Sequence, residues 1–208
     1  MPLDLWLTFV AASTALLLIP GPTVLLVMSY ALSKGRRVAV ATAAGVAVGD
    51  FIAMAASLLR LGALVLASAT LFTVLKWIGA VYLIYLGIRL LRSAPAPRAT
   101  VQAAHVSLPV RSIFGHAAAV TALNPKSIAF FIAFVPQFLR PDAPLLPQFA
   151  ILIATFVGLA TINALAYALL ADGLRTRIGR PSVLVWLNRA GGSALVAMGV
   201  MTAALRRS

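Results

Sequence analysis

Long apolar runs, separated by short basic segments, dominate this chain of 208 residues. Each run is longer than the roughly 20 residues that a helix needs to cross about 30 Å of hydrocarbon. The runs are Leu5–Ser33, Val38–Ala67, Thr70–Leu91, Ser112–Leu139, Ala143–Ala171 and Val183–Leu205. A helix satisfies its own backbone hydrogen bonds, so it is a form in which such runs can enter lipid. The pattern predicts an all-α membrane protein with six transmembrane helices.

Composition excludes a soluble domain. Hydrophobic residues make up 62% of the chain and charged residues 10%, against roughly 25% in a soluble domain. The mean hydropathy is +1.03. The net charge of +13 does not indicate nucleic-acid binding, because the basic residues cluster between the apolar runs without interleaved aromatics. We therefore expect a lipid bilayer, and no nucleic acid, as a partner.

The distribution of Lys and Arg predicts the orientation in the membrane. The loops after the first, third and fifth runs carry ten of these residues, whereas the opposite side carries at most four. Loops rich in Lys and Arg face the cytoplasm. Six spans then place both termini outside the cytoplasm.

The longest connection, residues 93–111, divides the chain into two halves. It is rich in Ala and Pro and has no apolar periodicity, which is typical of a flexible linker. We interpret residues 1–208 as a single transmembrane transporter domain. It consists of a first three-helix half (1–92), a cytoplasmic linker (93–111) and a second three-helix half (112–208).

Two proline motifs interrupt the first and fourth runs. They are Pro20-Gly21-Pro22 and Asn124-Pro125-Lys126. Proline breaks a helix and frees backbone groups, and lipid offers those groups no partner, so such breaks are tolerated only beside protein or a water-filled cavity. Paired interruptions at corresponding positions of two halves point to a transporter's binding site. We expect both motifs to contact the substrate, although Pro20-Gly21-Pro22 could also be a plain kink.

A weak internal repeat relates the two halves. Two glycines of the third run, Gly79 and Gly87, recur 112 residues later as Gly191 and Gly199. The two proline breaks are 105 residues apart. Three spans per half give the halves opposite topology, which is the inverted repeat of many secondary transporters. The sequence thus predicts two inverted three-helix repeats with broken helices one and four.

Asp50 is an acidic side chain deep inside an apolar run. A carboxylate at mid-bilayer costs on the order of 2.5–3.5 kcal/mol, so such a residue is a candidate for function. We predict that Asp50 couples transport to protons or faces a substrate ammonium group. The alternative is a permanent ion pair with Lys126.

Lys126 and Asn163 are the other polar candidates within the runs. A half-helix that begins after Pro125 presents free N–H groups and a positive dipole end, to which Lys126 adds a full charge. This favours an anionic group such as a substrate carboxylate, with interfacial snorkelling of Lys126 as the alternative. Asn163 could bind substrate through its amide or hold helices together.

Motifs of enzymes and metal sites are missing. The sequence has no Walker loop, no H-E-x-x-H and no G-x-S-x-G. It has no Cys, and neither of its two His residues has a partner at metal-ligand spacing. We therefore expect no enzymatic activity, cofactor or metal, and an ion gradient as the source of energy.

Taken in order, these motifs resemble the amino-acid exporter family that contains the lysine exporter and the homoserine/threonine exporters. The similarity runs over essentially the whole chain. Its pieces are Pro20-Gly21-Pro22, Gly45-xxx-Gly49-Asp50, Lys76-Trp77-Ile78-Gly79, Leu123-Asn124-Pro125-Lys126, Pro136-Gln137-Phe138 and Asn188-Arg189-xx-Gly192. The resemblance implies an amino-acid exporter of the bacterial inner membrane, driven by the proton gradient.

One departure from that family bears on the substrate. The branch that exports lysine and arginine tends to carry an acid shortly after the Asn-Pro, where this chain has Ser127-Ile128-Ala129-Phe130-Phe131. We therefore favour neutral amino acids such as homoserine, threonine or leucine. An inorganic-ion or metal-cation transporter of the same architecture and a non-transporting membrane scaffold are the alternatives. The sequence leaves a homo-oligomer open.

Overall fold

The computed structural model describes residues 1–35, 38–67, 69–92, 109–140, 143–171 and 181–204. These residues form helices joined by short connections and include no strand, as expected for an all-α membrane protein. The elements are α1 (Leu3–Leu18), α2 (Pro22–Lys34), α3 (Ala39–Ala67), α4 (Ala69–Arg92), α5 (Val110–Ala122), α6 (Pro125–Ala133), the 3₁₀ turn η2 (Val135–Phe138), α7 (Leu145–Leu169) and α9 (Pro181–Ala204).

The helices follow the apolar runs closely. The first run contains α1 and α2, and the fourth contains α5, α6 and η2; α3, α4, α7 and α9 occupy the other four. The boundary between the second and third runs falls at residue 68, outside the described residues. Most of the predicted linker, residues 93–111, also lies outside the described residues. Its last two residues belong to α5, which begins at Val110.

By length and composition, two single helices among the described residues are able to cross a membrane. They are Ala39–Arg60 within α3 and Leu145–Leu169, which is α7. The number rises to four if each of the bent pairs, α1 with α2 and α5 with the segment from Pro125 to Phe138, counts as one span. The described residues thus include helices that are long and apolar enough to span a membrane, and the six-span count remains a prediction.

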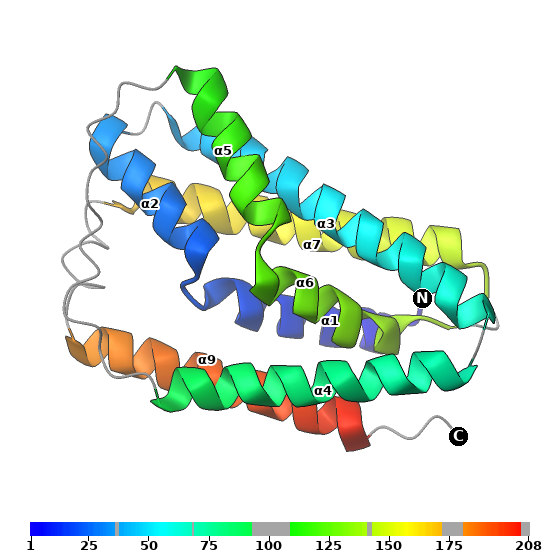
Figure 1. The fold of residues 1–208 in the computed structure, drawn as a ribbon. Coiled ribbons are helices and arrows are strands. Elements are labelled where there is room, and N and C mark those ends of the chain that lie inside the picture. Colours follow the sequence, from blue (N-terminus) through cyan, green and yellow to red (C-terminus); the bar gives the residue numbers. More distant parts are fainter. Residues whose placement is uncertain (36–37, 68, 93–108, 141–142, 172–180, 205–208) are drawn as a thin grey trace.

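Both proline motifs produce sharp bends. α1 and α2 meet at 56°, and α5 meets the segment from Pro125 to Phe138 at 46°. Pro22 and Pro125 each occupy the first position of a helix, where the missing N–H costs nothing. The residue before each proline is extended, as proline requires: Gly21 has φ −136° and ψ −172°, and Asn124 has φ −68° and ψ 111°. The two bends face each other in the middle of the molecule (Figure 1).

Glycines allow two pairs of helices to approach closely. A Cβ atom on Gly49 of α3 would lie 2.5 Å from the carbonyl oxygen of Ala118 in α5. A Cβ on Gly87 of α4 would lie 2.6 Å from the carbonyl oxygen of Gly192 in α9. Small residues permit such backbone contact between membrane helices. The pair Gly45 and Gly49 therefore packs α3 on α5 within the chain.

The packing of the helices does not decide the predicted repeat. The pairs that the repeat makes equivalent, α3 with α7 and α4 with α9, each pack against each other, and α4 runs along α9 in Figure 1. However, α3 contacts α5 far more extensively than α7 contacts α1, its expected counterpart. The inverted repeat thus remains a prediction.

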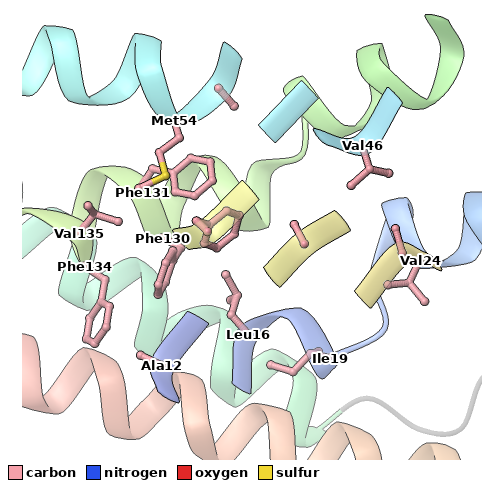
Figure 2. Close-up of a cluster of buried hydrophobic side chains, with 14 of the residues drawn as sticks. Ala12, Leu16, Ile19, Val24, Val46, Met54, Phe130, Phe131, Phe134 and Val135 are labelled. Carbon is pink, nitrogen blue, oxygen red and sulfur yellow. The ribbon is translucent and has the colours of Figure 1, made fainter. Parts of the chain in front are cut away.

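An aromatic core surrounds the central helices. Phe130 and Phe131 of α6 lie in one buried cluster with Phe134, which directly follows α6, and with Leu16 of α1 and Met54 of α3 (Figure 2). All five side chains are almost fully buried. The ring centroids of Phe130 and Phe134 are 5.2 Å apart. Fully buried aromatic rings dominate the packing energy of a core, so this cluster holds α6 and its preceding break against α1.

Candidate functional site

A cavity lies where the two helix breaks face each other. It is lined by residues of α1, α2, α3, α6 and α7 and by Gly21 and Asn124 at the breaks. Its volume is about 30 Å³, against roughly 300–1,000 Å³ for typical ligand pockets. In this conformation the cavity has room for water and not for an amino acid.

The cavity brings together most of the residues that the sequence singled out. The cavity is lined by residues from four of the apolar runs: Gly21, Asp50, Asn124 with Lys126, and Asn163. Pro20, Pro22 and Pro125 are not among the lining residues, and their part is to produce the breaks. The residues of the two motifs and of the middle helices thus meet at one place.

The C-terminal end of α1 is surrounded by hydrogen-bond donors from other helices. The bonds run from Lys126 Nζ to the carbonyl oxygens of Leu16 at 3.0 Å and Ile19 at 2.9 Å, from Asn163 Nδ2 to that of Leu17 at 3.2 Å, and from Tyr167 Oη to that of Leu18 at 3.1 Å. The last carbonyls of a helix have no partner within the helix and carry partial negative charge. Side chains of α6 and α7 therefore cap the broken end of α1.

Lys126 contacts the interior of the protein. Its ammonium group binds two backbone carbonyls of the α1 end, and its head lies beside Gly21, where an added Cβ would be 3.4 Å from Nζ. In this conformation the side chain reaches into the cavity, which disfavours interfacial snorkelling. Its predicted role towards a carboxylate remains a prediction.

Asp50 is buried and has a free oxygen. The residue is 2% exposed, and its Oδ1 atom is buried without a hydrogen-bond partner. In the described part of the chain, no ion pair joins it to Lys126, although the two side chains interact electrostatically across the cavity. The permanent ion pair is thus not a feature of this conformation. A buried polar atom without a partner costs free energy, so it needs an explanation, and a functional role is one.

Asn124 connects the two breaks. Its Oδ1 atom accepts a hydrogen bond from the backbone N–H of Lys126 at 3.1 Å, which caps the start of α6. Its Nδ2 atom donates to Thr23 Oγ1 at 3.2 Å, at the start of α2. Among the described residues no side chain caps the N-terminus of α2, and Thr23 and Val24 line the cavity. The cavity therefore faces the negative end of α1 and the positive ends of α2 and α6.

Sequence reasoning missed three polar residues of this site. Thr23 and Ser127 line the cavity, and Tyr167 caps α1. Each had a local signal: Thr23 and Ser127 directly follow the two motifs, and Tyr167 lies one helical turn after Asn163. Residues four apart share one face of a helix, so Asn163 and Tyr167 reach the same target.

Comparison with known proteins agrees with this picture. The profile of the family described as LysE type translocator matches residues 14–205. A homoserine/homoserine lactone efflux protein of Salmonella typhimurium is 35% identical over the full length of both chains. A leucine efflux protein of Salmonella choleraesuis is 28% identical over 84% of this chain and 81% of its own.

An uncharacterized membrane protein of Vibrio cholerae is 32% identical over 98% of each chain. No solved structure gives a significant match. The family profile spans nearly all of the chain, including both helix breaks and every residue of the cavity. This chain belongs to the family of LysE type translocators.

Proposed function

We propose that this protein is a secondary exporter of neutral amino acids in the bacterial inner membrane, and that the cavity between the breaks is its substrate site. One observation carries the proposal: helix ends of both polarities meet there around the buried carboxyl group of Asp50. Discontinuous helices offer such ends to charged substrate groups in secondary transporters. The similarity to efflux proteins for homoserine and leucine supports the same function.

The polarity of the site fits a zwitterion. The carbonyls that end α1 and the uncapped start of α2 are separated only by the turn at Pro20-Gly21-Pro22. An amino acid likewise carries its ammonium and carboxylate groups on one carbon atom. We assign the carboxylate to the starts of α2 and α6, with Lys126 beside it, and the ammonium to the α1 carbonyls and Asp50. Asn163 orients the α1 carbonyls from α7.

The substrate class follows from the charges of the site. Homoserine, its lactone and leucine share an α-ammonium group and a neutral side chain. A free carboxylate is not common to all three, because the lactone has none. Among the described residues that line the cavity, Asp50 is the sole acid. A lysine side chain would need a second counter-charge, because an unpaired buried charge is costly. Neutral amino acids therefore fit best.

Asp50 is the proposed site of proton coupling. Its carboxyl group is buried in the cavity and lacks a fixed partner, so protonation changes the charge next to the substrate directly. Moving one charge across 100 mV supplies about 2.3 kcal/mol. Exchange of a proton for an amino acid through one cavity would use this energy for export.

We further propose that all six apolar runs cross the membrane, with the first and fourth as broken helices. They form two inverted repeats, with both termini outside the cytoplasm. α4 and α9 have 24 residues each, which corresponds to a length of about 36 Å at 1.5 Å per residue. The small cavity, which has no room for an amino acid, then represents a state between the two in which the site is open to one side. Alternating access in such folds comes from rocking of one repeat against the other.

An efflux assay tests the proposal. Cells are loaded with dipeptides that release leucine, threonine, homoserine or lysine inside, and each amino acid is measured outside over time. The protein should accelerate efflux of neutral amino acids relative to cells with an empty vector. Unchanged efflux of every amino acid at confirmed membrane abundance would exclude the exporter.

Asp50→Asn tests the coupling in the same cells. We expect it to abolish efflux driven by the proton gradient while the protein still inserts. Asp4→Asn is the matched control, because Asp4 is an exposed acid in the first turn of α1. Wild-type efflux from Asp50→Asn would reduce Asp50 to a structural residue.

A further inference from the structure

The ammonium group of Lys126 occupies a position built from backbone carbonyls. It donates to the carbonyl oxygens of Leu16 at 3.0 Å and Ile19 at 2.9 Å. Both carbonyls belong to the end of α1, where the partial charge of the helix is negative. This geometry suits any cation that has several N–H donors, whether the cation belongs to the protein or to a bound molecule.

The donors around this helix end are of two kinds. Asn163 and Tyr167 are neutral, and both come from α7, a continuous helix of 25 residues. Lys126 is charged and comes from the second residue of α6, directly at a break. Its three N–H donors make two hydrogen bonds to carbonyls. The long, flexible stem of a lysine allows its head to leave such a position.

We infer that the carbonyl end of α1 is the subsite for the substrate's ammonium group, and that the ammonium of Lys126 occupies it in the empty transporter. The inference rests on the proposed function, since it assumes an amino-acid substrate. The α-ammonium of an amino acid has the same charge and the same three donors as the head of Lys126. It therefore displaces that head and takes over its hydrogen bonds.

The displacement has a consequence for the rest of the site. Once released, Lys126 remains next to Asp50 and the start of α6, where the substrate carboxylate is expected. Its charge then pairs with the carboxylate or with Asp50 instead of the helix end. Lys126 thus competes with the substrate for this position while it remains attached to the protein. When no substrate is bound, it keeps the carbonyl oxygens at the end of α1 hydrogen-bonded.

Chemical rescue tests the subsite without any transport. Lys126→Ala removes the ammonium and leaves space for a small amine. Ethylammonium should raise the melting temperature of this variant by about 2–4 °C or more when the site is saturated, whereas tetramethylammonium, which has no N–H donor, should not. Lys126→Met is the matched control, because its unbranched apolar side chain fills the space. Neither this control nor the wild type should respond to ethylammonium.

A second ligand tests the competition. Leucinamide has an ammonium group and no carboxylate. The concentration that half-saturates stabilisation should be at least about tenfold lower for Lys126→Ala than for the wild type, because apparent affinity scales with the fraction of vacant sites. If Lys126 served a carboxylate alone, leucinamide would bind both proteins equally, and the inference would be wrong.

The outcomes separate this inference from the exporter itself. The subsite is overturned, even if amino acids are exported, by either of two results. Ethylammonium does not change the melting temperature of folded Lys126→Ala, or it changes the melting temperatures of Lys126→Ala, Lys126→Met and the wild type equally. If ethylammonium stabilises only Lys126→Ala but no amino acid is exported, the subsite stands and the proposed function is wrong. If Lys126→Ala fails to fold, expression with ethylammonium in the medium should restore the inserted protein, whereas tetramethylammonium should not. Failure of both amines would also overturn the inference.

Discussion

Gly49→Ala should separate α3 from α5 and disturb the cavity. The added Cβ would lie 2.5 Å from the carbonyl oxygen of Ala118 and 2.7 Å from the Cβ of Thr121. Ordinary contacts begin at about 3.5 Å, so the two helices must move apart by about 1 Å. Overpacking of this kind costs about 1–3 kcal/mol. Asp50 is the next residue and moves with the helix, so amino-acid efflux should fall as well.

Gly115→Ala is the matched control for this change. Gly115 lies within α5, and an added Cβ would meet nothing within 4 Å. Both variants gain about 1 kcal/mol of helix propensity, so their difference isolates the packing cost. A difference of about 1–3 kcal/mol corresponds to about 2–12 °C in melting temperature for a chain of this size. Thermal unfolding of both purified variants measures it. Equal melting temperatures would refute the close contact between α3 and α5.

Three further predictions address the other parts of the fold. Pro125→Ala should strongly reduce efflux at normal membrane abundance, because proline keeps Asn124 extended and starts α6 at the cavity. The control is Pro147→Ala, at an exposed position in the first turn of α7, which should transport normally. Equal efflux from both variants would show that transport does not need the break. Gln148→Ala should lower stability by about 1–3 kcal/mol, since Gln148 makes four hydrogen bonds to the backbone of Arg140, Ala143 and Pro144; unchanged thermal unfolding would contradict this. A reporter that is active only in the cytoplasm, fused after Ser208, should stay inactive in an intact fusion, and strong activity would reverse the predicted orientation.

The helices and their breaks could be predicted from the sequence because their causes are local. A proline removes its own N–H and restricts the residue before it, whatever surrounds it. Pro20-Gly21-Pro22 and Asn124-Pro125 therefore mark bends of 56° and 46° without reference to the rest of the chain. The apolar runs likewise bound the helices, since each run must satisfy its backbone within itself in lipid. Asp50 was recognisable as a candidate because its burial in such a run is costly.

Which groups meet at the breaks was decided by the tertiary structure alone. The sequence assigned Lys126 to a substrate carboxylate, whereas in the fold its ammonium binds carbonyls of α1, more than 100 residues earlier in the chain. Tyr167 caps the same helix end, and Gly49 contacts α5. Backbone carbonyls leave no mark in a sequence, and a side chain's partner depends on how distant helices pack. The free end of α1 thus became a cation-binding position only when α6 and α7 were packed against it.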